Sequence, residues 1–138
     1  MKKLLAFVIA LTILVSIGTA VFAYPMPQDI GSYTNYSFNI GGSVIFPTER
    51  HMQFVATYGI HNNESMASGY FTTKIYAVTP SLVSATESKS IYSGQRIALT
   101  YFTNYSGHYE YGYRLSMTNQ AYYGNSATGT WAPNDNVQ

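Results

Sequence analysis

The chain has 138 residues, of which 46% are hydrophobic, 16% are aromatic and only 9% are charged. It contains fourteen tyrosines, one tryptophan and no cysteine, and its formal net charge is +1. This composition excludes an intrinsically disordered chain, because disorder goes with few aromatic residues and many charges. The lack of cysteine excludes a disulfide scaffold, a thiolate metal site and a cysteine nucleophile. Nucleic-acid binding is not expected either, since it needs a surplus of Lys and Arg.

The N-terminus has the pattern of a secretory signal peptide. Two lysines precede an apolar run over residues 4–15, and Ala23 and the valine two positions before it fit the −1 and −3 positions of a cleavage site. We therefore predict that residues 1–23 form a signal helix that is cleaved before Tyr24, leaving no stable membrane span. An uncleaved anchor is the alternative, because residues 4–23 are just long enough to cross a bilayer.

Cleavage would change the charge balance and indicates the compartment. Loss of the two N-terminal lysines leaves the six acidic residues in excess by one, so the mature charge would be −1. Exported domains of this size in eukaryotes and in the periplasm often contain disulfides, so the missing cysteine favours a Gram-positive bacterium. The tail, residues 134–138, is polar. We therefore expect a released, extracellular protein.

The mature chain has the period-two alternation of β-strands and no sustained helical stripe. After a leader over residues 24–33, residues 34–133 are predicted to form one all-β domain. Turn residues at short intervals favour an antiparallel β-sandwich, Ig-like or jelly-roll-like, with about six to eight strands. The alternating sets are Tyr36, Phe38 and Ile40; Met52, Phe54, Ala56 and Tyr58; Phe71, Thr73, Ile75 and Ala77; and residues 126–131.

Three other segments have weaker patterns. Residues 44–46 are short and end at a proline, which predicts a brief edge strand. Residues 61–65 (HNNES) are predicted to form a polar turn. Residues 82–92 alternate with serines and threonines and are predicted to form an edge strand or a long loop.

Residues 95–118 have the clearest pattern, which predicts a β-hairpin. A turn over residues 104–107 separates two alternating apolar sets, and Gly107 is expected to take any positive φ. A loop of three or five residues would place both sets on one face, whereas an even loop would split them. The two sets are Ile97, Leu99 and Tyr101, and Tyr109, Tyr111, Tyr113, Leu115 and Met117.

No residue pattern indicates a metal site, a bound cofactor or a catalytic centre. Glycoside hydrolysis needs two carboxylates, and Glu110 is better explained as a solvent-facing residue paired with Arg96 or Arg114 across a sheet. Zinc sites commonly show closely spaced histidines, and neither that spacing nor a GxSxG nucleophile motif is present. The three histidines stand alone in the sequence: His51, His61 and His108.

The tyrosines are the most unusual feature of the chain. A phenol combines apolar area with a polar tip, which suits ligand surfaces, sugar stacking and protein interfaces. Tyr105, Tyr122 and Tyr123 fall in expected loops, the last two close to Trp131 in the sequence. These four residues are the predicted partner-binding site, with cell-wall glycan or a surface protein as the partner. The strand tyrosines are expected to fill the rim of the core.

Short motifs are spread over most of the mature chain: YPMP (24–27), YSFNI (36–40), YFTT (70–73), YRLSMTN (113–119) and SATGTWAPND (126–135). With them the chain resembles a group of small secreted Gram-positive proteins of unassigned activity, some of which are associated with bacteriocin-type loci. The resemblance implies export and a compact β-fold, and it supplies no catalytic residue. SYTNY (32–36) is similar to the lactococcin 972-type bacteriocins, which are also exported, disulfide-free and β-rich.

These observations lead to three expected functions. The first is a non-enzymatic secreted β-sandwich that binds a cell-surface partner through tyrosine-rich loops. The second, implied by the resemblance, is a secreted antimicrobial protein or its accessory. The third is a matrix or assembly component whose exposed edge strands pair between molecules. An enzyme comes last, because no residue pattern favours one.

Overall fold

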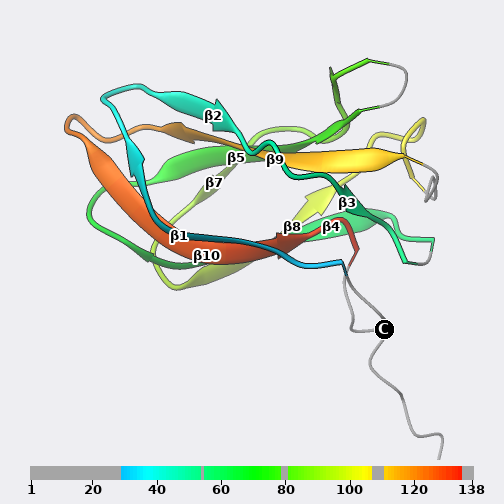
Figure 1. Cartoon of the computed structure of the whole chain (residues 1–138), viewed down its shortest axis with the longest axis horizontal. Coiled ribbons are helices and arrows are strands. Elements are labelled where there is room, and N and C mark those ends of the chain that lie inside the picture. Colours follow the sequence, from blue (N-terminus) through cyan, green and yellow to red (C-terminus); the bar gives the residue numbers. More distant parts are fainter. Residues whose placement is uncertain (1–28, 54, 79–80, 107–110, 135–138) are drawn as a thin grey trace, which may run out of the picture.

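The chain forms two antiparallel β-sheets that pack face to face (Figure 1). The computed structural model describes residues 29–53, 55–78, 81–106 and 111–134, and within these ranges it contains no helix. The predicted all-β sandwich is confirmed. None of the described residues belongs to a helix that could span a membrane. The expected signal peptide, its expected cleavage site at Ala23 and the first part of the expected leader lie outside the described residues.

The first sheet has four strands in the order β1-β10-β4-β8. The strand expected over residues 126–131 is confirmed as β10. Its small and apolar side chains face the opposite sheet from alternate positions, and its buried residues include Ala127 and Trp131. The four strands are β1 (Gly31–Phe38), β10 (Asn125–Ala132), β4 (Tyr58–Met66) and β8 (Gln95–Thr100).

The second sheet has a central pair, β9 and β5, flanked by short edge strands. The alternation of Phe71, Thr73, Ile75 and Ala77 is confirmed, because all four are buried on one face of β5. The edge strand predicted over residues 44–46 is confirmed, and residues 82–92, expected as an edge strand or a long loop, contain two short edge strands. The residues that the structure describes form ten strands, more than the six to eight expected. The strands are β2 (Ser43–Ile45) and β3 (Arg50–His51) beside β9 (Gly112–Asn119), and β6 (Val83–Ser84) and β7 (Lys89–Ile91) beside β5 (Phe71–Ala77).

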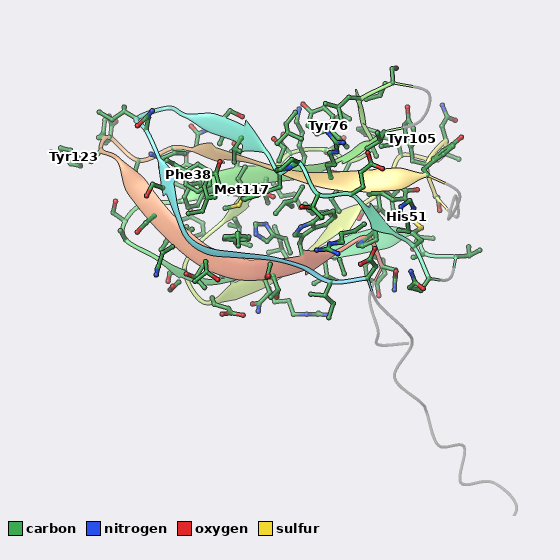
Figure 2. The ribbon with its side chains drawn as sticks, in the orientation of Figure 1. Phe38, His51, Tyr76, Tyr105, Met117 and Tyr123 are labelled. Carbon is green, nitrogen blue, oxygen red and sulfur yellow. The ribbon has the colours of Figure 1, made fainter. Side chains whose placement is uncertain are left out.

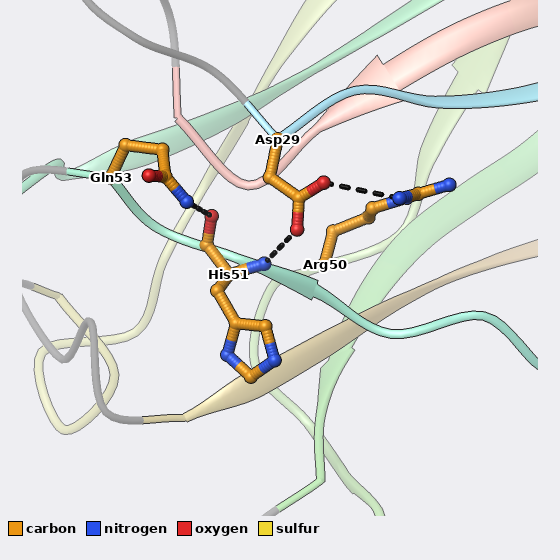
Figure 3. A network of polar contacts seen from close by, with 4 residues as sticks. All are labelled: Asp29, Arg50, His51 and Gln53. Atoms are coloured by element: carbon orange, nitrogen blue, oxygen red, sulfur yellow. Dashed lines mark hydrogen bonds and ion pairs between the residues drawn. The ribbon is translucent and has the colours of Figure 1, made fainter.

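The folded body extends beyond the predicted limits at both ends. β1 begins at Gly31, where the expected domain begins at residue 34, and Asp29 holds the chain just before it. The two carboxylate oxygens of Asp29 accept hydrogen bonds from Arg50 Nη1 (3.1 Å) and from the backbone N of His51 (2.9 Å) (Figure 3). Asn134, expected in the polar tail, is buried, and its Oδ1 accepts a hydrogen bond from the backbone N of Gln53 (3.1 Å).

The predicted hairpin over residues 95–118 is wrong. β8 pairs with β4 in the first sheet, whereas β9 pairs with β5 in the second, so the chain crosses between the sheets at this point. Both strands still turn their apolar sets toward the core, with Leu99 and Leu115 buried. Alternation cannot distinguish a hairpin from such a crossing, because it reports the buried face of a strand and not its neighbour. Gly107 and Glu110 lie outside the described residues.

The predicted turn over residues 61–65 is also wrong, because this segment forms the middle of β4. His61 and Asn63 are fully buried there despite their polar side chains. The strand expected over residues 52–58 is not observed: β4 starts only at Tyr58, and the described residues between His51 and Tyr58 form no strand. Polar residues are stable inside a sheet when their hydrogen bonds are satisfied, and here distant parts of the chain provide the partners.

A chain of buried hydrogen bonds runs from the first sheet to the second through His61. Its Nε2 lies 2.7 Å from the hydroxyl of Tyr33, and its Nδ1 lies 2.9 Å from Oγ1 of Thr73. The Thr73 hydroxyl donates to the carbonyl of Ser116 (3.1 Å), so the proton between Thr73 and His61 must come from Nδ1. The Tyr33 phenol has two acceptors within reach, Nε2 of His61 and the more distant Oδ1 of Asn63 (3.3 Å). Because burial lowers the pKa of the His61 ring, Nε2 carries no proton and accepts that of the phenol. The ring is therefore neutral, with the proton on Nδ1.

The pH dependence of stability should carry the signature of this histidine. Burial lowers the pKa of His61 from 6.5 to about 3. Its contribution is complete above pH 6.5 and is lost as the pH falls toward 3, because the unfolded chain takes up a proton that the folded protein does not. In urea titrations we expect the free energy of unfolding to fall by up to about 1.4 kcal/mol per pH unit on account of His61.

The comparison is sharpest between pH 6 and pH 5, where exposed carboxylates titrate little. The control Gln120→Ala removes an exposed side chain that does not titrate and should leave the slope unchanged. His61→Gln should lower stability and abolish this part of the slope. Equal slopes for the wild type and His61→Gln would contradict the assignment.

Candidate functional site

Four turns of the chain meet at one end of the sandwich, opposite the end at which β10 finishes (Figure 1). They are brought together because the strands that they connect are paired in register: Asn119 and Ile91 both lie beside Phe71, and Phe38 lies beside Asn125. We call this surface the tyrosine end. Its turns are residues 39–42, 67–70, 92–94 and 120–124.

The tyrosine end exposes large side chains and contains no charge. Tyr122 is 90% exposed and Tyr123 is 75% exposed, and Ile40 (68%) and Tyr92 (48%) are exposed on neighbouring turns. The ring of Tyr70 packs against that of Tyr92, with centroids 5.4 Å apart. None of the residues in the four turns is Asp, Glu, Lys, Arg or His. An uncharged patch of large exposed side chains is a typical feature of interaction surfaces.

A buried asparagine holds the two most prominent turns together. The Nδ2 of Asn119 donates to the carbonyl of Asn39 (3.0 Å) and to the carbonyl of Tyr123 (2.9 Å). Its Oδ1 accepts a hydrogen bond from the backbone N of Ala121 (3.0 Å). The β9–β10 turn is thereby closed on itself and joined to the β1–β2 turn by one side chain that is itself buried.

A second buried asparagine connects the β4–β5 turn. Asn125 makes a two-way contact with Ser68, donating from Nδ2 to its carbonyl (2.6 Å) and accepting from its backbone N at Oδ1 (3.2 Å). Nδ2 also lies 3.2 Å from Oδ1 of Asn119. The backbone N of Gln120 donates to the carbonyl of Tyr70 (3.1 Å). These contacts fix the turns, so Tyr122 and Tyr123 project from an ordered backbone and not from a loose loop.

The structure brings together only two of the four residues predicted as the binding site. Tyr122 and Tyr123 form the tip, but Tyr105 is half-buried at the opposite end of the sandwich, beside the ring of Tyr111 (Figure 2). Trp131 is 4% exposed. Its indole covers Gly31, where an added Cβ would lie only 2.3 Å from Nε1. Trp131 therefore serves the packing of β10 against β1.

Sequence reasoning missed the residues that other turns contribute. Ile40, Tyr70 and Tyr92 come from turns far from Tyr122 in the chain, and two asparagines hold the turns in place. The lack of charge in these glycine-rich turns was visible in the sequence. Their proximity was not, because it depends on which strands pair.

Two hollows lie elsewhere on the surface of the described residues. One, of about 220 Å³, lies over the first sheet and includes Asn62 and Arg96. The other, of about 290 Å³, includes Glu87, Lys89 and Phe102. The Lys89 ammonium in the second hollow donates to the carbonyl of Ala98 (2.8 Å).

Two of the three histidines, His51 and His61, lie within the described residues, in different environments. The ring of His51 points away from the carboxylate of Asp29, which binds its backbone instead (Figure 3). His61 is used within the core, and His108 lies outside the described residues. In the part of the chain that the structure describes, no three potential metal ligands among His, Cys, Asp and Glu gather together. Arg114, one of the two arginines expected beside Glu110, pairs with Glu49 at 2.8 Å, and Glu110 itself lies outside the described residues.

No known protein family, curated protein or solved structure matches the chain. The family resemblance described above therefore stays an expectation.

Removal of the Asn119 side chain tests whether it supports the tyrosine end. Asn119→Ala deletes an amide that bonds the backbone at three places. The carbonyl of Asn39 keeps its bond from the backbone N of Gly42, whereas the carbonyl of Tyr123 and the N–H of Ala121 lose their bond to the amide. We expect the free energy of unfolding to fall by roughly 2–4 kcal/mol. Amide exchange of Ala121 should become faster. The neighbouring exposed change Gln120→Ala is the control and should alter stability by less than about 0.5 kcal/mol; an equally small effect of Asn119→Ala would contradict the role assigned here.

Proposed function

We propose that this protein is an exported, non-enzymatic binding module that attaches to a component of the cell surface through its tyrosine end. The observation that carries the proposal is the pair Tyr122 and Tyr123, which project almost fully exposed from a turn held by buried asparagines. Export is supported by the signal-peptide pattern at the N-terminus.

The rigid support of the two tyrosines favours binding. Association loses affinity when side chains and loops must become ordered, and a turn that is already ordered avoids much of this cost. Tyrosine adds to the advantage, because its large contact area has only two rotatable side-chain bonds. An exposed aromatic pair also has no stabilising role in the core, so partner recognition is the function that explains its position.

The absence of charge indicates what kind of contact is made. With no ionisable side chain in the four turns, the tyrosine end has no groups for salt bridges with a partner. Attachment is then driven by apolar burial and neutral hydrogen bonds. Such contacts are screened little by salt, in contrast to those of a charged surface.

Retention on cells of the producing organism tests this function. The double change Tyr122→Ala with Tyr123→Ala should reduce the retained fraction of purified mature protein at least tenfold, because aromatic anchors at the centre of an interface contribute about 1–2 kcal/mol or more each. The matched control is Phe102→Ala, which removes an exposed aromatic ring outside the tyrosine end. Retention should be measured by sedimentation with whole cells and with envelope fractions.

The result that would refute the proposal is equal retention of the wild type and the double variant, or no retention of either. The other expected roles give different results with the same material. An antimicrobial protein would inhibit the growth of related strains at micromolar concentration. A matrix component would sediment without cells, as assemblies that grow with protein concentration.

A further inference from the structure

We infer that the ligand of the tyrosine end is an uncharged polysaccharide, bound as an extended chain across the row of turns. This inference rests on the proposed function and adds the chemical class of the ligand. Three properties of the surface support it: the exposed side chains form a row, their chemistry matches that of sugar rings, and they lack the charged groups that other ligand classes need.

The exposed side chains form a row and not a compact spot. At this end the second sheet presents, from one edge to the other, Ile40 before β2, the Tyr122 turn after β9, Tyr70 before β5 and Tyr92 after β7. The strands end level with one another, since Asn119, Phe71 and Ile91 lie side by side. Neighbouring strands are about 4.8 Å apart, so the row spans about 14 Å. That length matches several linked units of a polymer better than one small molecule.

The chemistry of the row matches that of sugar rings. A neutral sugar has an apolar face of C–H groups, which can pack on an aromatic ring, and a rim of hydroxyl groups. The exposed rings of Tyr122, Tyr123 and Tyr92 supply stacking faces, and their phenol hydroxyls can donate and accept hydrogen bonds. The Nε2 of Gln120 donates to Oγ1 of Thr72 (3.1 Å), and the amide oxygen of this exposed side chain adds an acceptor beside them. Apolar faces edged by neutral polar groups are therefore present on both partners.

Other ligand classes fit this surface less well. Anionic polymers and nucleic acids need Lys or Arg, and the four turns contain neither. Membrane-surface segments combine Trp, Phe or Leu with basic residues, and these are missing as well. Protein-binding hot spots are enriched in Trp and Arg beside Tyr, and here only Tyr is present. An uncharged polysaccharide is the class of ligand whose apolar faces and hydroxyl groups match the tyrosine rings and neutral polar groups of the four turns.

The test is co-sedimentation of the mature protein with insoluble cellulose, chitin, xylan and starch, at low salt and at tenfold higher salt. We expect retention on at least one of these, unchanged by salt, and tighter binding of a six-unit oligosaccharide than of a two-unit one by at least tenfold. The double change Tyr122→Ala with Tyr123→Ala should abolish retention. Tyr92→Ala, at the far end of the row, should weaken it several-fold, and Phe102→Ala should leave it unchanged.

The outcomes separate this inference from the proposed function. Retention on cells without retention on any of the four polysaccharides overturns the inference alone. Binding to phosphatidylglycerol vesicles in place of the polysaccharides also overturns it, and so does a loss of retention when the cells are treated with protease. Polysaccharide retention that is unaffected by the Tyr122 and Tyr123 changes also overturns it. Absence of binding to both cells and polysaccharides overturns the function as well.

Discussion

A buried histidine joins the two sheets through hydrogen bonds that constrain the register of β4, the strand on which it lies. His61 binds Tyr33 at the edge of its own sheet and Thr73 on the opposite sheet. A polar group left unpaired in the interior costs about 1–3 kcal/mol, so the arrangement is favourable only when all three side chains meet at once. A shift of β4 by one residue would turn His61 toward solvent and break both contacts. This chain of bonds therefore acts together with the apolar alternation of the other strands in selecting one register.

The selected register extends to the tyrosine end. With β4 held against β10, the turn that follows β4 lies beside the β9–β10 turn, within reach of Asn125. Asn119, at the end of β9, bonds the backbone of the same β9–β10 turn at Ala121 and Tyr123. These buried amides satisfy the hydrogen-bonding groups of the turn backbone. Tyr122 and Tyr123 make no part of the core and are exposed on the surface. The surface proposed to bind a ligand is thus a consequence of polar groups buried beneath it.

Sequence patterns predicted the elements well where a strand has one buried and one exposed face. β5 alternates along its whole length, and the expected last strand matches β10 within one residue at each end. The errors occurred where long-range partners override the local pattern. Residues 61–65 look like a turn until Tyr33 and Thr73 are placed beside His61, and the crossing from β8 to β9 has the same alternation as a hairpin. Trp131 illustrates the same limit, because a large aromatic ring near a loop gives no sign of being buried over Gly31.

The sequence by itself determined the class of the fold, the position of most strands and the presence of uncharged tyrosines in a turn near the C-terminus. These are local properties, set by side-chain alternation and turn composition over a few residues. The tertiary structure decided which strands pair, which polar residues are buried and which of the predicted site residues stay on the surface. Those outcomes depend on hydrogen-bond partners that are distant in the chain. Only the paired sheets bring residues 39–42, 67–70, 92–94 and 120–124 to one end, and that proximity turns two exposed tyrosines into an extended surface.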